Sequence, residues 1–282
     1  MKQCKALLKK EWQTHWRTIL TPLLFLAVIY VTILLSLLIN LIKHGGITRQ
    51  SFVSFLNFGL EAPYWISMSV TTLLGFVHMV SGIILADGLI NGDHKRQCQI
   101  FHFSQPLPFV KIAGTKYLFA CIAPILMLAA TSFVNVLVVN LWIGFYKHTY
   151  FWMGMMGWLQ TLISVGLSIL FVSSLAWFFA GIFKRKSFPL GILCLLGIEI
   201  ILQTLNYMVG WHIPSLMENL MKLINMNVST PAIALEYTKQ SITRLVRANW
   251  QDVFSTVNVL KIGLSAVFGV LGALLYKRRE LR

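Results

Sequence analysis

Two ionisable residues lie inside long apolar runs, where a charge is costly and chemistry becomes a possibility. Glu199 is flanked by Ile198 and Ile200 near the middle of one run, and His78 lies within another. A carboxylate in lipid should face the interior of a helix bundle with a partner, or be protonated. The two residues could line a substrate path or couple transport to protons, or each could make only an interhelical hydrogen bond. Both interpretations stay open.

Motifs for catalysis and nucleotide binding are absent from the sequence. Gly114-Thr115-Lys116 has the wrong order for the phosphate-binding loop of ATPases and lacks its preceding glycine. There is also no His-Glu-x-x-His pair, no Gly-x-Ser-x-Gly elbow and no Cys-x-x-Cys pair. We therefore expect that this chain is not an enzyme and holds no metal or cofactor of its own.

The composition indicates a membrane protein. Of the 282 residues, 57% are hydrophobic and only 12% are charged, about half the charge of a soluble domain. The 24 Lys and Arg residues outnumber the 9 Asp and Glu residues, which gives a net charge of +15. In a hydrophobic chain, such cations are typical of the cytoplasmic ends of membrane spans. The lipid bilayer is thus the expected partner, and nucleic acid is not.

Six apolar runs are long enough to cross a bilayer core, which needs roughly 20 residues of helix. They predict an all-α, polytopic membrane protein with six transmembrane helices. An even number of spans puts both termini on one side, and most Lys and Arg residues lie near the termini and in the loops on that side. We expect cytoplasmic termini and a bacterial plasma (inner) membrane. The runs are 22–42, 64–86, 117–145, 158–183, 188–209 and 259–276.

The first 20 residues form a separate basic, amphipathic segment ahead of the spanning domain, 21–282. Tryptophans four apart alternate with cations, which is typical of a helix lying flat in the headgroup layer. An ordinary solvated helix leading into the first span is the alternative. The residues that define this segment are Lys9, Lys10, Glu11, Trp12 and Trp16.

Two connecting segments carry further patterns. The inner loop, 87–116, passes from a charged start to an apolar patch, which needs either the membrane or a soluble partner to cover it. The outer segment, 210–258, has helical spacing of apolar residues in 216–224 and a possible second helix in 232–247. The residues of the inner loop that we expect to contact the membrane or the soluble partner are His94, Lys95, Arg96, Ile100, Phe101 and Phe103.

The last span contains two further features. Ser265, Gly269 and Ala273 are small residues four apart, which lets another helix approach closely, either within the bundle or across a dimer seam. Lys261 lies near the start of the span, from where we expect its amine to reach the membrane surface.

These features together resemble the permease subunits of ABC-type-2 transporters. The N-terminal run Leu7-Leu8-Lys9-Lys10-Glu11-Trp12 is similar to the amphipathic elbow helix of that family. Asp87 at the exit of the second span, the Gln105-Pro106-Leu107-Pro108 turn and the following Lys111 and Lys116 are similar to its inner loop. The large outer segment is also similar to that of the family. So is the C-terminal run Tyr276-Lys277-Arg278-Arg279-Glu280-Leu281.

The resemblance implies a transport subunit of an exporter that takes its energy from a separate ATP-binding subunit. ATP and magnesium would be bound by that partner, and two permease subunits, identical or different, would form the substrate pathway. The elbow helix and the loop residues 94–103 would transmit closure of the ATPase to the spans. The alternative is a stand-alone, gradient-driven secondary transporter that uses Glu199 as its coupling group.

Overall fold

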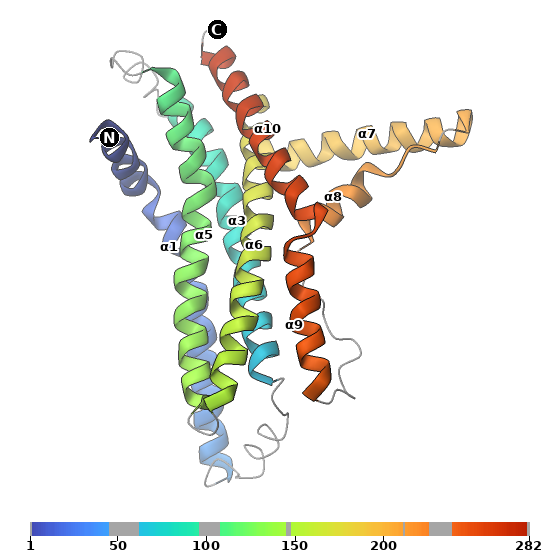
Figure 1. The fold of residues 1–282 in the computed structure, drawn as a ribbon. Helices are drawn as coiled ribbons and strands as arrows, with labels where there is room; N and C mark the ends of the chain where they lie inside the picture. The colour runs from blue at the N-terminus through green and yellow to red at the C-terminus, as the bar shows by residue number, and fades with distance from the viewer. Residues whose placement is uncertain are drawn as a thin grey trace.

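In the part of the chain that the structure describes, six helices are long and apolar enough to cross a membrane. The structure, a computed structural model, describes residues 2–44, 62–95, 108–144, 148–210, 212–225 and 239–280, and these contain helices and no strands. The predicted all-α, six-span class is therefore confirmed. The helices are α1 Lys2–His44, α3 Ala62–Lys95, α5 Phe109–Gly144, α6 His148–Ile182, α7 Ser187–Val209, α8 Leu216–Ile224, α9 Lys239–Val253 and α10 Thr256–Glu280 (Figure 1).

The long helices extend beyond the apolar runs that predict them. α3, α5 and α6 contain 34, 36 and 35 residues, so each is about 50 Å long and longer than a bilayer core is thick. α1 contains 43 residues and includes both the predicted amphipathic segment and the first span. Pro22 lies between these two parts and removes one backbone hydrogen bond. The N-terminal part of α1 diverges from the line of the bundle (Figure 1).

α6 is the central helix, and it packs along α3, α5 and α10. Of its most apolar window 72% is buried, against 12% for α1. Ser164, Ser168, Ser173 and Ser174 are buried on α6, and such small side chains let neighbouring helices approach closely. The sequence of α6 is therefore suited to a position with helices on several sides.

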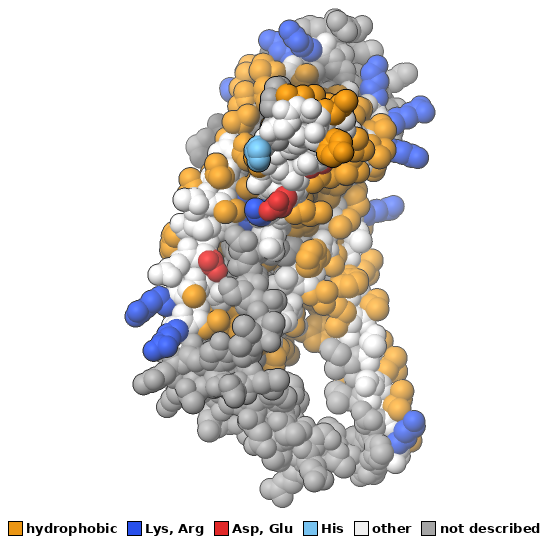
Figure 2. All heavy atoms as spheres, turned by 90° about the vertical axis from the view of Figure 1, so that its right-hand side faces the viewer, with side chains coloured by type: hydrophobic (Ala, Val, Ile, Leu, Met, Phe, Trp, Pro, Cys, Tyr) orange, Lys and Arg blue, Asp and Glu red, His pale blue; other side chains and the backbone are white. Residues whose placement is uncertain are grey.

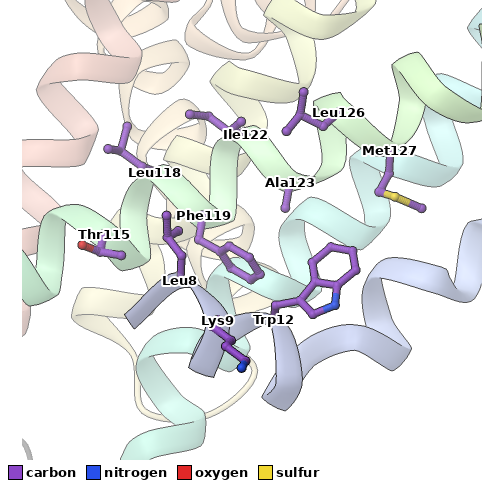
Figure 3. Close-up of a pocket in the computed structure, with 10 residues that line it drawn as sticks. All are labelled: Leu8, Lys9, Trp12, Thr115, Leu118, Phe119, Ile122, Ala123, Leu126 and Met127. Carbon is purple, nitrogen blue, oxygen red and sulfur yellow. The ribbon is translucent and has the colours of Figure 1, made fainter. Parts of the chain in front are cut away.

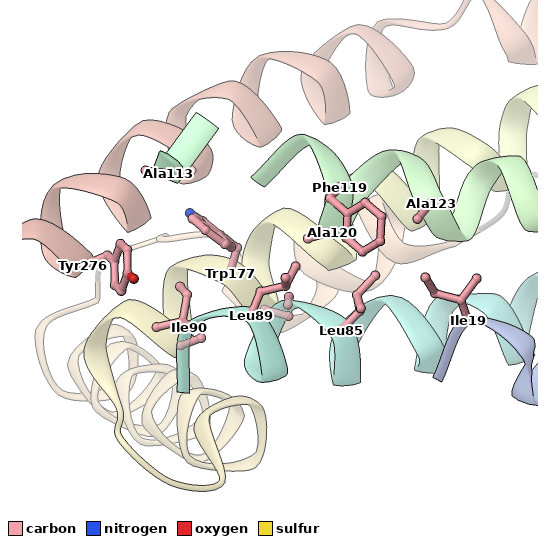
Figure 4. Packing of buried hydrophobic residues seen from close by; sticks show 13 residues of the cluster. Ile19, Leu85, Leu89, Ile90, Ala113, Phe119, Ala120, Ala123, Trp177 and Tyr276 are labelled. Atoms are coloured by element: carbon pink, nitrogen blue, oxygen red, sulfur yellow. The ribbon is translucent and has the colours of Figure 1, made fainter. Parts of the chain in front are cut away.

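One end of the bundle, which we call the proximal end, is where α3 ends, α5 begins and α6 turns into α7. Both chain termini lie toward this end (Figure 1). Its core contains Trp177 of α6 and Tyr276 of α10, with Leu89 and Ile90 of α3 packed against them (Figure 4). Ile19 of α1 belongs to the same buried cluster. The proximal end is therefore assembled from helices that are distant in the sequence.

The small-residue face of α10 packs inside the bundle. A Cβ at Gly269 would lie 2.6 Å from the ring of Tyr117, and the Tyr117 hydroxyl donates to the Ser265 carbonyl at 2.7 Å. A Cβ at Gly272 would lie 2.4 Å from the indole of Trp177. Of the two interpretations of this face, internal packing is confirmed.

α7 leaves the bundle and extends sideways from the proximal end (Figure 1). The turn before it places Lys186 in the left-handed region, at φ 48°. Only 6% of its most apolar window is buried. α8 follows as a short amphipathic helix, as the spacing in 216–224 predicts, and it returns toward the bundle. We call α7 and α8 together the arm.

α9 lies against the other, distal end of the bundle, where α3 begins. Asn249 of α9 donates to the Tyr64 hydroxyl, and that hydroxyl donates to Gln160 of α6, both at 2.6 Å. Gln160 in turn donates to the Val246 carbonyl at 2.9 Å. A second helix in the outer segment is thus confirmed: in the described part it spans Lys239–Val253, which overlaps the predicted 232–247, and residues 226–238 lie outside the described part.

The expectation for Lys261 is wrong. Its side chain is fully buried instead of reaching the membrane surface. The amine donates to the Ser168 hydroxyl at 2.9 Å and to the Asn225 carbonyl at 3.1 Å. The carbonyl at the end of α8 and the hydroxyl of α6 supply the polar contacts that a buried ammonium requires, so the lysine holds α8 to the bundle.

Candidate functional site

A hydrogen-bonded group at the proximal end joins α3 to the turn between α6 and α7. The Asp87 carboxylate accepts from the Asn91 amide, at 2.6 Å, and from the Ser187 hydroxyl. Asn91 also donates to the Phe183 carbonyl at 3.3 Å. Since Ser187 begins α7 and Phe183 follows α6, a movement of the end of α3 would be passed directly to both helices.

A buried lysine forms a second group beside the first. Lys116 of α5 is 2% exposed, and its amine donates to the Leu89 carbonyl of α3 at 3.1 Å. The same amine lies 5.6 Å from the ring centroid of Tyr276, close enough for a cation–π contact. Lys116 therefore connects α3, α5 and the end of α10.

The N-terminal part of α1 packs against the same stretch of α3. Glu11 is 3% exposed, and its carboxylate lies 3.9 Å from the imidazole of His15. A Cβ at Gly88 would lie 3.2 Å from that imidazole, so the glycine leaves room for α1 next to Asp87. The amphipathic segment thus contacts α3 directly beside the Asp87 group.

The two faces of this segment differ as an amphipathic helix requires. Leu7 and Ile19 are buried with Glu11, whereas Trp12 and Trp16 are 44% and 45% exposed. The guanidinium of Arg17 lies 5.7 Å from the Trp16 ring. The exposed cations of this face include Lys9 and Lys10.

The residues predicted to contact an ATPase fall mostly outside the described part of the chain. The backbones of His94 and Lys95 form the last residues of α3. The structure describes nothing of the other four, Arg96, Ile100, Phe101 and Phe103. The described part therefore places the start of the predicted loop at the proximal end, next to the groups above.

Glu199 does not face the interior of the bundle, so that expectation is wrong. It lies partly exposed on α7, and its carboxylate accepts from the backbone amides of Leu216 and Met217, at 2.8 and 3.3 Å. Gln203 donates to the other carboxylate oxygen at 2.9 Å. The first turn of α8 presents free amides and a positive dipole end, and these are the partners that the carboxylate takes.

His78 is fully buried, as its position in an apolar run predicts. Its Nδ1 atom bonds to the Leu74 carbonyl of the same helix at 2.8 Å. Its Nε2 atom has no hydrogen-bond partner in the described part of the chain. The expected interhelical hydrogen bond is therefore not seen at this residue. Buried His78 and partly exposed Glu199 occupy different environments and do not form one polar site.

Sequence reasoning missed Asn91, Ser187 and the aromatic pair of Trp177 and Tyr276. Asn91 lies four residues after Asp87, so helical spacing alone could have linked these two. Ser187 is 100 residues away from Asp87, and no local pattern connects them. The described residues contain no group of His, Cys, Asp or Glu side chains that could hold a metal. The proximal end is thus a junction where hydrogen bonds and packing join helices that are distant in the sequence.

The fold and this junction define a polytopic, all-helical membrane-spanning protein. Comparison of the chain with protein-family models, curated proteins and solved structures finds no match.

Proposed function

We propose that this chain is the permease subunit of an ATP-driven ABC exporter. In this proposal it forms the substrate pathway together with a second permease subunit, and a separate subunit binds ATP and magnesium. The observation that carries the proposal is the junction at the proximal end. There the amphipathic segment, the exit of α3, the start of α5, the turn into α7 and the end of α10 are in direct contact.

Such a junction suits a subunit that is driven from outside. A push on the loop after α3 would reach α7 through Asp87 and Ser187, and α5 through Lys116 and the Leu89 carbonyl. Packed helices respond to such a push as rigid bodies, because close-packed interiors deform little. Movement of α3, α5 and α7 relative to one another would then open the pathway alternately to the two sides.

The charge at the proximal end supports a cytoplasmic location for it. Figure 2 shows Lys and Arg side chains gathered mainly toward this end, above a face with many apolar side chains. Exposed cations follow α6 and end α10, and short basic segments of this kind remain in the cytoplasm. An ATP-binding subunit would meet the chain on that side. The exposed cations are Lys184, Arg185, Lys186, Lys277 and Arg278.

The arm supports a second permease subunit. α7 is a 23-residue apolar helix that contacts the bundle through its first turns, at Ser187 and Phe188, and exposes a long apolar surface beyond them. Ile200 and Ile201 in its middle are 66% and 60% exposed. In the proposed assembly, α7 packs on the other permease subunit, which is a second copy of this chain in a homodimer or a different chain in a heterodimer.

The secondary-transporter alternative receives less support. A proton-coupling carboxylate needs to face a pathway, whereas both oxygens of Glu199 bind Gln203 and the start of α8. His78 lies on a different helix in a fully buried position. The alternative nevertheless makes a distinct prediction, because only a gradient-driven carrier would work without an ATPase.

Purification from the native host separates the two functions. The tagged chain in a mild detergent should elute with a stoichiometric soluble protein that carries ATPase motifs, and the complex should hydrolyse ATP in a vanadate-sensitive manner. Replacing Phe101 and Phe103 with alanine should abolish substrate-stimulated hydrolysis without affecting membrane insertion. Phe254→Ala, which removes a 77% exposed phenylalanine between α9 and α10, is the control and should hydrolyse ATP normally.

The opposite results would overturn the proposal. A chain that purifies alone, shows no ATP turnover and transports its substrate with energy from an ion gradient would be a secondary transporter. Transport that is lost in Glu199→Gln would then identify its coupling group.

A further inference from the structure

A groove separates the N-terminal part of α1 from the first half of α5. It has a volume of about 770 Å³, within the range of pockets that bind small ligands. Leu8 and Trp12 form one wall, and Leu118, Ile122 and Leu126 form the other (Figure 3). The walls are thus apolar side chains from two helices that diverge at the proximal end.

The walls of the groove are open, but its floor is fixed. Leu118, Ile122 and Leu126 are 53%, 44% and 62% exposed. Phe119 and Ala123, on the next face of α5, belong to the buried cluster of the proximal end. The groove therefore has a preformed shape and is not closed by any described side chain of the chain itself.

One charged residue lies at the groove. Among the described residues that line it, only Lys9 carries a charge, and its amine points away from the α5 side chains (Figure 3). Lys9 precedes Trp12 by less than one helical turn, and tryptophan and lysine are both typical of the membrane interface. From Leu118 to Leu126 the wall extends about 12 Å along α5, away from the proximal end. The groove thus has a cationic mouth and an apolar body.

We propose that this groove binds one anionic phospholipid from the leaflet at the proximal end. An acyl chain lies between Trp12 and Ile122, and the phosphate binds the Lys9 amine. The match is one of charge and shape, since an apolar slot with a single cation at its mouth complements an apolar chain with a single anion at its head. A zwitterionic lipid would fill the same slot, but its headgroup cation would oppose Lys9.

Lipid binding to the purified full-length chain tests the proposal. Native mass spectrometry in mild detergent would count the molecules of phosphatidylglycerol or phosphatidylcholine that remain bound. We expect one tightly held phosphatidylglycerol, preferred over phosphatidylcholine about fivefold for one lysine at the membrane surface. Lys9→Gln should remove the preference and retain equal binding of both lipids. Lys5→Gln, an exposed lysine of the same helix that does not line the groove, should retain it.

Filling the groove provides an independent measurement. Ile122→Trp should displace the bound lipid, whereas Val138→Trp, at a 54% exposed position farther along α5, should not. A phosphatidylglycerol with a photoreactive acyl chain should crosslink to 118–126 in preference to 134–138. The comparison of the two tryptophan variants separates occupation of the groove from a general effect of bulk on a lipid-facing helix.

Three results would overturn the proposal: equal retention of the two lipids by the unaltered chain, an equal effect of Lys5→Gln and Lys9→Gln, or crosslinks distributed evenly along α5. None of these measurements uses ATP or a transported substrate. The lipid site and the exporter function can therefore fail separately.

Discussion

The proximal end and the arm both use a carboxylate to hold helix ends, but the two carboxylates connect very different parts of the chain. Asp87 binds Ser187, which is 100 residues away, inside an end of the bundle where α1, α3, α5, α6 and α10 meet. Glu199 binds Leu216 and Met217, at most 18 residues away, on the adjoining helix of the arm. One carboxylate joins distant elements, and the other shapes a local hairpin.

This difference separates global from local stability. Contacts between distant helices form only when the whole bundle folds, so their loss should lower the stability of the whole molecule. Contacts within the arm can open without unfolding the bundle. Local hydrogen bonds join α7 to the start of α8, and Lys261 holds the end of α8 to the bundle. The apolar surface of α7 is left for lipid or for another subunit.

The largest expected effect on stability is at Gly272 of the proximal end, and Gly197 of the arm is its matched control. Gly272→Leu would place a side chain into the Trp177 indole, 2.4 Å from the Cβ position, and against the Phe178 backbone at 3.2 Å. Overpacking of this kind costs about 1–3 kcal/mol or more. A Cβ at Gly197 of α7 would meet nothing within 4 Å, so Gly197→Leu starts from open space. Thermal unfolding in detergent should show a large loss for the first variant and none for the second.

The matched substitution makes this test specific. Both variants introduce the same side chain into a helix, and leucine has a higher helix propensity than glycine, so Gly197→Leu should be neutral or slightly stabilising. Equal destabilisation by the two variants would mean that α7 is packed as closely as the bundle, and the distinction between the two regions would fail.

An intermediate effect is expected at Asp87. Asp87→Ala removes the acceptor of both Asn91 and Ser187, and a hydrogen bond to a charged group is worth about 1.5–3 kcal/mol. Asp87→Asn keeps an acceptor oxygen and should lose less. Equilibrium unfolding of both variants would measure the difference. If both are as stable as the unaltered chain, the proximal group does not join α3 to α7 energetically.

The sequence predicts the class of fold because hydrophobic length is a local property. Each span is a run of consecutive apolar residues, and the helical spacing of apolar residues in 216–224 predicts the amphipathic helix. The small-residue face around Gly269 could be identified but not assigned to a partner, because the complementary Tyr117 lies on another helix. Local patterns thus give the elements and leave their neighbours open.

The site was harder to predict because it depends on contacts between distant residues. The sequence predicts Lys261 at the membrane surface, because no residue near it in the sequence indicates that the Ser168 hydroxyl and the Asn225 carbonyl are its partners. Glu199 was expected in the bundle because its own run is apolar on both sides. The direction in which α7 leaves the bundle decides its environment, and that direction depends on the turn at Lys186.

The smallest effect on overall stability is expected at Glu199. Ser215 accepts from the Glu218 amide at 3.1 Å, so together with Glu199 it satisfies the amides of the first turn of α8. Glu199→Ala leaves the amides of Leu216 and Met217 without this partner, because Ser215 already binds the next one.

Hydrogen exchange should therefore become faster at the start of α8, while the unfolding temperature stays unchanged. Glu199→Gln keeps an acceptor oxygen and should lie between Glu199→Ala and the unaltered chain. A fall in unfolding temperature comparable with that of Asp87→Ala would show that the arm folds as one unit with the bundle. The local hydrogen bonds of α7 and α8 would then be part of the same cooperative structure as the proximal end, and the contrast between the two carboxylates would be one of position only.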